Sequence, residues 1–405
     1  MTTAIDIEKN KSFVQKLGKS PLIWLLVFLP LLDFGCRVIK PLQFVAIKNF
    51  RPIEFDSWVS KFPPYLDSKI RPDVLIVGSS LPMAAFALAD KKFAESKSAE
   101  DQDGLRTYTE AAVFKKGMLE KLGISARVEN FSCAGGMVSD TYIFLKRLID
   151  EGRIPRMVLY GISPRDFVDN MMPPLGQSPL FEVVSDWGFE IPKEGLSTPQ
   201  YLSCICANYS YYYKTRRKHR NVLTAITADA LGRPRDLFTA SHNRHNENRL
   251  DLPTGEQEKE TKETAAPANN PVETDLHWYK KRYNPLNTDR FENETAYLKK
   301  LVTLCENHQV ILVLIGMPLT EPNKKLMPPQ LVSSYVEALA GVQDNNQVKW
   351  VDLANTSSFA PQDFSDSAHL NRVGSMKFQK LLLEKMANMA IRPGPQRRES
   401  TPKMF

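Results

Sequence analysis

The segment DVLIVGSS, residues 73–80, is a short apolar run that ends in a glycine and two serines. Four further β-rich segments follow along the chain: ARVENFSCAG (126–135), MVLYGIS (157–163), VILVLIGMP (310–318) and VKWVDLA (348–354). Four of the five are nearly continuous apolar runs, as parallel strands buried on both faces should be. The sequence therefore predicts a sheet of about five parallel strands.

Helical patterns alternate with these segments. They cover residues 83–96, 108–122, 141–152, 291–308, 329–339 and 375–389. A repeated order of strand, helix and strand predicts a doubly wound α/β sheet. Residues 164–290, between the third and fourth strands, do not fit the repeat and form a long insertion. Its part from about 254 to 275 is polar and poor in apolar residues, so we expect a disordered linker there.

The composition is that of a folded protein. The chain has 405 residues, of which 42% are hydrophobic and 24% are charged. We expect one large domain over residues 51–390, followed by a flexible basic tail over 391–405. The net charge of +7 lies in separate short clusters without a recognised nucleic-acid motif, so no nucleic-acid partner is predicted. The five cysteines lack the spacing of a zinc site or a redox pair.

The stretch PLIWLLVFLPLLDFGCRVI, residues 21–39, is the most apolar part of the chain. It reaches the length of a membrane span, about 20 residues, once Asp33 and Arg37 near its end are included. An uncleaved signal anchor is the favoured interpretation; a soluble core helix and a cleaved signal peptide are the alternatives. Residues 1–50 would then comprise a cytoplasmic tail, the anchor and a connector. The predicted protein crosses the cell membrane once, with its main domain extracytoplasmic.

Candidate catalytic residues follow three of the predicted strands, at the edge where α/β sheets bind ligands. Ser80 follows the first strand, Gly135 the second, and the pair Asp366 and His369 the fifth. Taken singly, Ser80 is typical of a helix N-cap, and Gly135 is typical of a tight turn. Together the residues supply a nucleophile, an oxyanion donor, a general base and a carboxylate that orients it.

The ordered motifs GSS, NFSCAGG and DSAHLNRVG resemble those of the SGNH (GDSL-type) hydrolase superfamily. The closest similarity is to its membrane-anchored bacterial branch, which includes DltD-like proteins and exopolysaccharide acyltransferases. The resemblance covers most of residues 73–389 outside the insertion and implies a flavodoxin-like three-layer sandwich. It implies that Ser80 is the nucleophile, His369 the base and Asp366 its orienting partner. The N–H groups of Ser80 and Gly135 would be oxyanion donors, and no cofactor or metal is expected.

The third motif departs from the family pattern. The family has Asn two residues after the glycine that ends the third strand, whereas this chain has Ser163 two residues after Gly161. Ser163 and Arg165 are therefore the candidates for the missing oxyanion donor. We expect Ser163 to face the pocket, and Arg165 to pair with Asp166 or with the insertion instead.

Three other features carry weaker hypotheses. His242 and His245 have the spacing of metal ligands but no third ligand nearby in the sequence, so no metal is predicted. The run YSYYYKTRRKHR, residues 209–220, is read as lid structure or as a helix on an anionic membrane surface; an RNA-binding stripe is disfavoured. Cys133 is expected to be a small buried apolar residue rather than a nucleophile.

The predicted function is that of a membrane-anchored serine esterase or O-acyltransferase. It would act on acyl esters of envelope or exopolysaccharide glycans, and a membrane-bound O-acyltransferase would be the partner that supplies the acyl group. The altered third motif supports an alternative from another class. In that case the chain is a catalytically inactive surface protein that binds glycan or assists polymer assembly.

Overall fold

The computed structural model describes residues 21–39, 58–90, 92, 104–185, 188–191, 193, 196–216, 219, 223, 275–343 and 346–394. The chain divides into two compact units. The larger unit contains Pro52–Ser185, Pro192–Gln200 and Asn246–Phe405; the smaller contains Met1–Arg51, Asp186–Ile191 and Tyr201–His245. The insertion predicted for residues 164–290 is therefore divided between the two units.

The larger unit is built on a sheet of five parallel strands in the order β2-β1-β3-β4-β5. The strands are β1 (Val74–Gly78), β2 (Val128–Asn130), β3 (Met157–Ile162), β4 (Ile311–Gly316) and β5 (Val348–Asp352). All five predicted strands are confirmed, and each is shorter than the segment that predicted it. The chain passes from β2 back across β1 to β3, and such a switch point leaves a crevice at the carboxyl edge of the sheet.

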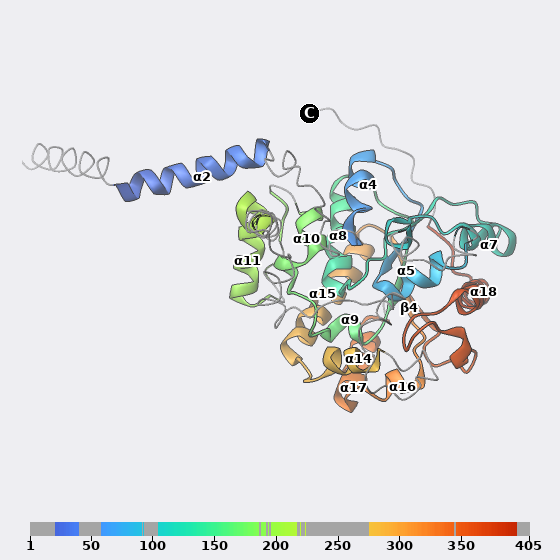
Figure 1. The fold of residues 1–405 in the computed structure, drawn as a ribbon. Helices are drawn as coiled ribbons and strands as arrows, with labels where there is room; N and C mark the ends of the chain where they lie inside the picture. Colours follow the sequence, from blue (N-terminus) through green and yellow to red (C-terminus); the bar gives the residue numbers. More distant parts are fainter. Residues whose placement is uncertain are drawn as a thin grey trace, which may run out of the picture. The chain divides into compact units, whose positions relative to one another are not determined.

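Two groups of helices pack with the sheet. The first consists of α5 (Ser80–Ala87), α7 (Ala112–Leu122) and α18 (Arg372–Asn388), and the second of α8 (Val138–Asp150), α15 (Thr288–Asn307) and α17 (Pro329–Gln343). In Figure 1, α8 and α15 lie to the left of β4 while α7 and α18 lie to its right. Other elements of this unit include α4 (Phe62–Ser68), α9 (Arg165–Val168), η3 (Leu175–Gln177), α10 (Pro179–Val184), α14 (Leu276–Tyr283), α16 (Glu321–Lys324) and η6 (Pro361–Asp363).

Two glycines let β1 turn directly into α5. Gly78 has a φ of +130°, and a Cβ atom at this position would lie 2.5 Å from the carbonyl oxygen of Gly161 on β3. A Cβ atom on Gly161 would in turn lie 2.6 Å from Pro82 of α5. Because the helix can begin at once, it starts at Ser80 and ends at Ala87, which corrects the predicted range of 83–96.

The smaller unit contains α2 (Pro21–Ile39) and the part of α11 (Thr198–Tyr209) from Tyr201 onward. Most of the side chains described on α2 are apolar and largely exposed, including those of Trp24, Phe28 and Val38. In the described part of the chain, no helix has both the length and the apolar character that a membrane span requires. The predicted anchor is therefore not confirmed.

The polar residues of α2 bind the tyrosine-rich segment that follows α11. Asp33 accepts the backbone N–H groups of Tyr211 and Tyr212, each at 2.8 Å, and the Ser210 hydroxyl at 3.0 Å. Asp33 thus caps the helical turns over residues 211–216. Arg37 donates to the carbonyl oxygen of Asn208 at 2.6 Å. Both charges that interrupt the apolar stretch are therefore used in contacts within this unit.

Candidate active site

Ser80 lies at the carboxyl end of β1, as its position in the sequence predicts. It is the first residue of α5, and its side chain is buried. The N–H groups in the first turn of a helix have no partner within the helix, so the Ser80 N–H is oriented to donate outward. The turn from β1 thus presents a hydroxyl and a backbone donor at the same residue.

His369 joins Ser80 to Asp366. Its Nε2 lies 2.8 Å from the Ser80 Oγ, and its Nδ1 lies 2.7 Å from Asp366 Oδ2. The other carboxylate oxygen of Asp366 accepts the N–H groups of Ala368 at 2.8 Å and His369 at 2.6 Å. The structure thus brings Ser80 together with Asp366 and His369, which lie 289 positions or nearly so further along the chain, in the geometry of a serine, a base and an orienting carboxylate.

The charges of Asp366 and His369 stabilise each other. Burial alone would raise the pKa of Asp366, but His369 and the two N–H groups outweigh it, so the pKa of Asp366 is lowered. Burial would likewise lower the pKa of His369, yet the Asp366 carboxylate raises it above the ordinary value of 6.5. The arrangement therefore favours an imidazolium beside a carboxylate, which is the state formed when His369 accepts a proton from Ser80.

The loop after β2 places Gly135 beside the strand that leads to Ser80. Gly135 has a φ of +74°, and a Cβ atom there would lie 2.5 Å from the Met172 sulfur. The Cys133 N–H donates to the Gly78 carbonyl oxygen at 2.8 Å, which ties the loop to the end of β1. Among the described residues, no backbone hydrogen bond uses the Gly135 N–H outside the helices and strands. This group is therefore a candidate oxyanion donor, as the sequence predicts.

Arg165 and Ser163 occupy different environments. Arg165 is buried and donates to Asp166, to Asp169 at 2.6 Å, and to the Gly136 carbonyl oxygen at 2.9 Å. The hydrogen bonds of its guanidinium thus connect α9 to the loop that carries Gly135. The Ser163 hydroxyl is also buried, but it has no hydrogen-bond partner within the described part of the chain.

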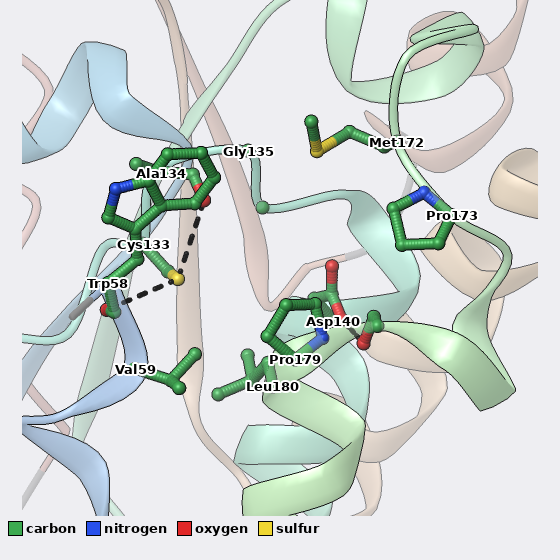
Figure 2. Close-up of a pocket in the computed structure, with 12 residues that line it drawn as sticks. Trp58, Val59, Cys133, Ala134, Gly135, Asp140, Met172, Pro173, Pro179 and Leu180 are labelled. Carbon is green, nitrogen blue, oxygen red and sulfur yellow. Dashed lines mark hydrogen bonds between the residues drawn. The ribbon is translucent and has the colours of Figure 1, made fainter. Parts of the chain in front are cut away.

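A small cavity adjoins the loop that carries Gly135. Its volume is about 20 Å³, roughly the space of one water molecule. Figure 2 shows the Trp58 ring and the Met172 side chain on either side of Gly135, with Asp140 on the side away from Trp58. The other side chains of the lining are mostly apolar, among them Val59, Pro173, Pro179 and Leu180.

The structure adds two buried ionisable groups that the sequence did not reveal. Lys61 donates to the Asn130 carbonyl oxygen at 3.2 Å, and burial lowers the pKa of Lys61 to about 8. Glu294 on α15 accepts the N–H of Ser139 at 2.7 Å, and burial raises the pKa of Glu294 to about 8. Neither Lys61 nor Glu294 stands in a sequence pattern that predicts its burial or its shifted pKa.

Asp275 is a further residue near the site, and it stands at the end of the linker predicted for about 254–275. The structure places its carboxylate at the loop that carries Asp366 and His369. Asp275 Oδ1 accepts the N–H of Ser367 at 3.2 Å. The reason is that α14 begins at the next residue and fixes the end of the polar segment. The remainder of the predicted linker lies outside the described residues.

The weaker sequence hypotheses have mixed outcomes. Cys133 is buried, and burial raises the pKa of its thiol to about 12, which leaves it protonated at neutral pH. His242 and His245 lie outside the described residues. Of the run 209–220, the described part contacts α2 through Asp33 as given above.

Neither a scan against protein-family models nor a search of the curated proteins found a match.

Proposed function

We propose that this chain is an SGNH-type serine esterase or O-acyltransferase that acts on acyl esters of glycans. The observation that carries the proposal is the continuous chain of short contacts from Ser80 Oγ through His369 to Asp366. Buried serine hydroxyls are common, but few of them lie on an imidazole that a charged carboxylate orients. The position at the carboxyl edge of the sheet, next to the switch point, adds support.

In the proposed reaction, Ser80 Oγ attacks the carbonyl carbon of an acyl ester while His369 Nε2 takes the Ser80 proton. Asp366 stabilises the imidazolium that results. The N–H groups of Ser80 and Gly135, with the Ser163 hydroxyl, donate to the oxyanion. His369 then returns the proton to the leaving alcohol, and an acyl-serine remains. A glycan hydroxyl or water attacks the acyl-serine with His369 as base, which releases the new ester or the free acid and restores Ser80.

Exposed apolar side chains on α2 support a membrane location, because soluble proteins rarely leave such a surface uncovered. A tethered enzyme next to envelope polymers favours a glycan acceptor, and the acyl donor would be a membrane-bound O-acyltransferase.

The second candidate function is non-catalytic glycan binding by the same fold. The observation that favours it is the third motif, where a serine stands in place of the amide donor. Losing one oxyanion donor typically lowers the rate by about 10²–10³. The two candidates differ in whether Ser80 reacts.

The test is covalent labelling of the purified full chain with a fluorophosphonate. We expect the parent and Ser125→Ala to be labelled and Ser80→Ala to remain unlabelled, since Ser125 is an exposed serine before the start of β2, at the edge of the sheet opposite to Ser80. Hydrolysis of p-nitrophenyl acetate should fall by about 10³ or more in Ser80→Ala and in His369→Ala. A parent protein without labelling or turnover would favour the binding function instead.

A further inference from the structure

Asp275 is a second carboxylate beside the proposed triad. It precedes α14, and its Oδ1 accepts the N–H of Ser367, the residue after Asp366. Burial and the nearby charge of Asp366 raise the pKa of Asp275, and the charge of Asp275 in turn contributes to the raised pKa of His369. Asp275 thus interacts with both ionisable members of the triad although it lies within the insertion, far before them in the sequence.

The two ends of α14 are both fixed to the loop of Asp366 and His369. At its start, Asp275 accepts from Ser367. At its end, the Tyr283 hydroxyl donates to Asn323 Oδ1 at 2.9 Å, and Asn323 Nδ2 donates to Ser367 Oγ at 2.9 Å. Thr320 Oγ1 also donates to the Ser367 carbonyl oxygen at 2.7 Å. Because Ser367 is held from several directions, the distance between Asp275 and the His369 loop is well defined.

The charges that face His369 come from three elements. Asp366 lies on its own loop, Asp275 lies at the start of α14, and Arg165 lies on α9 with an opposing effect. Arg165 is paired with Asp166 and Asp169, so its charge is largely compensated. The net environment of the His369 ring is therefore negative, and Asp275 is a negative contributor that lies outside the three family motifs.

We infer that Asp275 is a positioning residue of this site: it holds the Asp366–His369 loop through Ser367 and directs a second negative charge at the His369 ring. That charge stabilises the imidazolium formed when Ser80 gives its proton to His369 Nε2. The electrostatic part of the inference stands on the structure alone, and the catalytic part rests on the proposed function.

The test is an NMR titration of the histidine rings in the full chain. The chain has six histidines, and His369→Gln identifies the resonance of His369 by its loss. We expect the pKa of His369 to lie above 6.5 in the parent and to fall by about 0.5 to 1 pH unit in Asp275→Asn. Asp275→Glu should restore most of the difference. Asp289→Asn, a change of an exposed carboxylate at the start of α15, should leave the titration unchanged.

Kinetics supply the second measurement. The acid limb of the kcat/KM profile for p-nitrophenyl acetate should move to lower pH in Asp275→Asn, with kcat about tenfold lower and KM little changed. An unchanged His369 titration in Asp275→Asn overturns the inference, whatever happens to activity. If the titration moves but the parent neither reacts with fluorophosphonate nor hydrolyses esters, the proposed function fails and the electrostatic inference stands.

Discussion

The Ser163 hydroxyl is a buried polar group without a hydrogen-bond partner in the described part of the chain. Leaving such a group unsatisfied costs about 1–3 kcal/mol, and donation of a hydrogen bond to a bound oxyanion would recover part of that cost. Ser163 directly follows β3, and β3 pairs with β1 up to Gly161 and Gly78. Ser163 and Ser80 each stand two residues beyond those glycines, which places both residues at the carboxyl edge of the sheet.

Substitutions at Ser163 test this role. Ser163→Asn restores the amide of the family pattern and should raise ester hydrolysis by the full chain severalfold, because an amide donates a stronger, better-directed bond to the oxyanion. Ser163→Ala should lower kcat about 10-fold or more with little change in KM. Initial rates with p-nitrophenyl acetate measure both. Equal activity in all three proteins would exclude Ser163 as a donor.

The raised pKa of Glu294 predicts how the free energy of unfolding depends on pH. Its pKa is raised to about 8 from 4.5, so the folded state holds a proton that the unfolded state releases. The stabilisation is present below pH 4.5 and is lost as the pH rises to 8, by about 3–5 kcal/mol. Glu294→Gln mimics the protonated form, so urea unfolding should show the variant close to the parent at pH 5 and clearly more stable at pH 8.5. Glu292→Gln, an exposed neighbour on α15, is the control and should show no such difference.

Arg165 connects α9 to the loop of Gly135, so its substitution should affect stability before chemistry. Arg165→Ala leaves Asp166 without its buried partner and should lower the free energy of unfolding by about 3–5 kcal/mol. Arg147→Ala, which breaks a half-exposed pair with Glu151 on the helix surface, should cost less than about 1 kcal/mol. The free energy of unfolding, measured in urea, distinguishes the two variants. A stable Arg165→Ala protein without activity would make Arg165 the oxyanion donor in place of Ser163.

The strands were predictable because buried parallel strands have a simple signature. β1, β3 and β4 are almost wholly apolar, and their segments contain no competing helical period. The start of α5 was misjudged by three residues, since the turn depends on how closely Gly78 approaches Gly161 across the sheet. No local pattern encodes a contact between residues 83 positions apart.

The site was predictable to the extent that its residues follow strands. Ser80 comes directly after β1, and Asp366 and His369 lie in the segment between β5 and α18, so the topology brings them to one edge. Asp275 follows a polar segment instead, and its role depends on where α14 starts and on the hydrogen bond to Ser367. Lys61 and Glu294 depend on burial by distant elements. Such tertiary effects leave no mark on the adjacent sequence.

The whole chain combines a polar α/β unit with a strongly apolar helix, and the membrane proposal explains this combination. We expect the full chain to stay in the membrane fraction after alkaline carbonate treatment and the larger unit to be digested by protease added to spheroplasts. The double substitution Phe28→Glu and Leu31→Glu should release the protein, because each charge in the bilayer centre costs roughly 3 kcal/mol. Val336→Glu, at an exposed apolar residue of α17, should not. Release of the parent by carbonate, or protection from protease in spheroplasts, would contradict the proposal.

The separation of Ser80 and His369 has a consequence for how the protein is made. The two residues are 289 positions apart, and α18, which follows His369, packs on α5 that carries Ser80. At synthesis rates of about 5–20 residues per second, the ribosome completes Ser80 roughly 15–60 s before His369. Throughout that interval the nascent chain carries a serine without its base. The hydroxyl acquires its partner only when the last tenth of the polypeptide arrives, so under the proposed function an unfinished or C-terminally truncated chain would not react with esters.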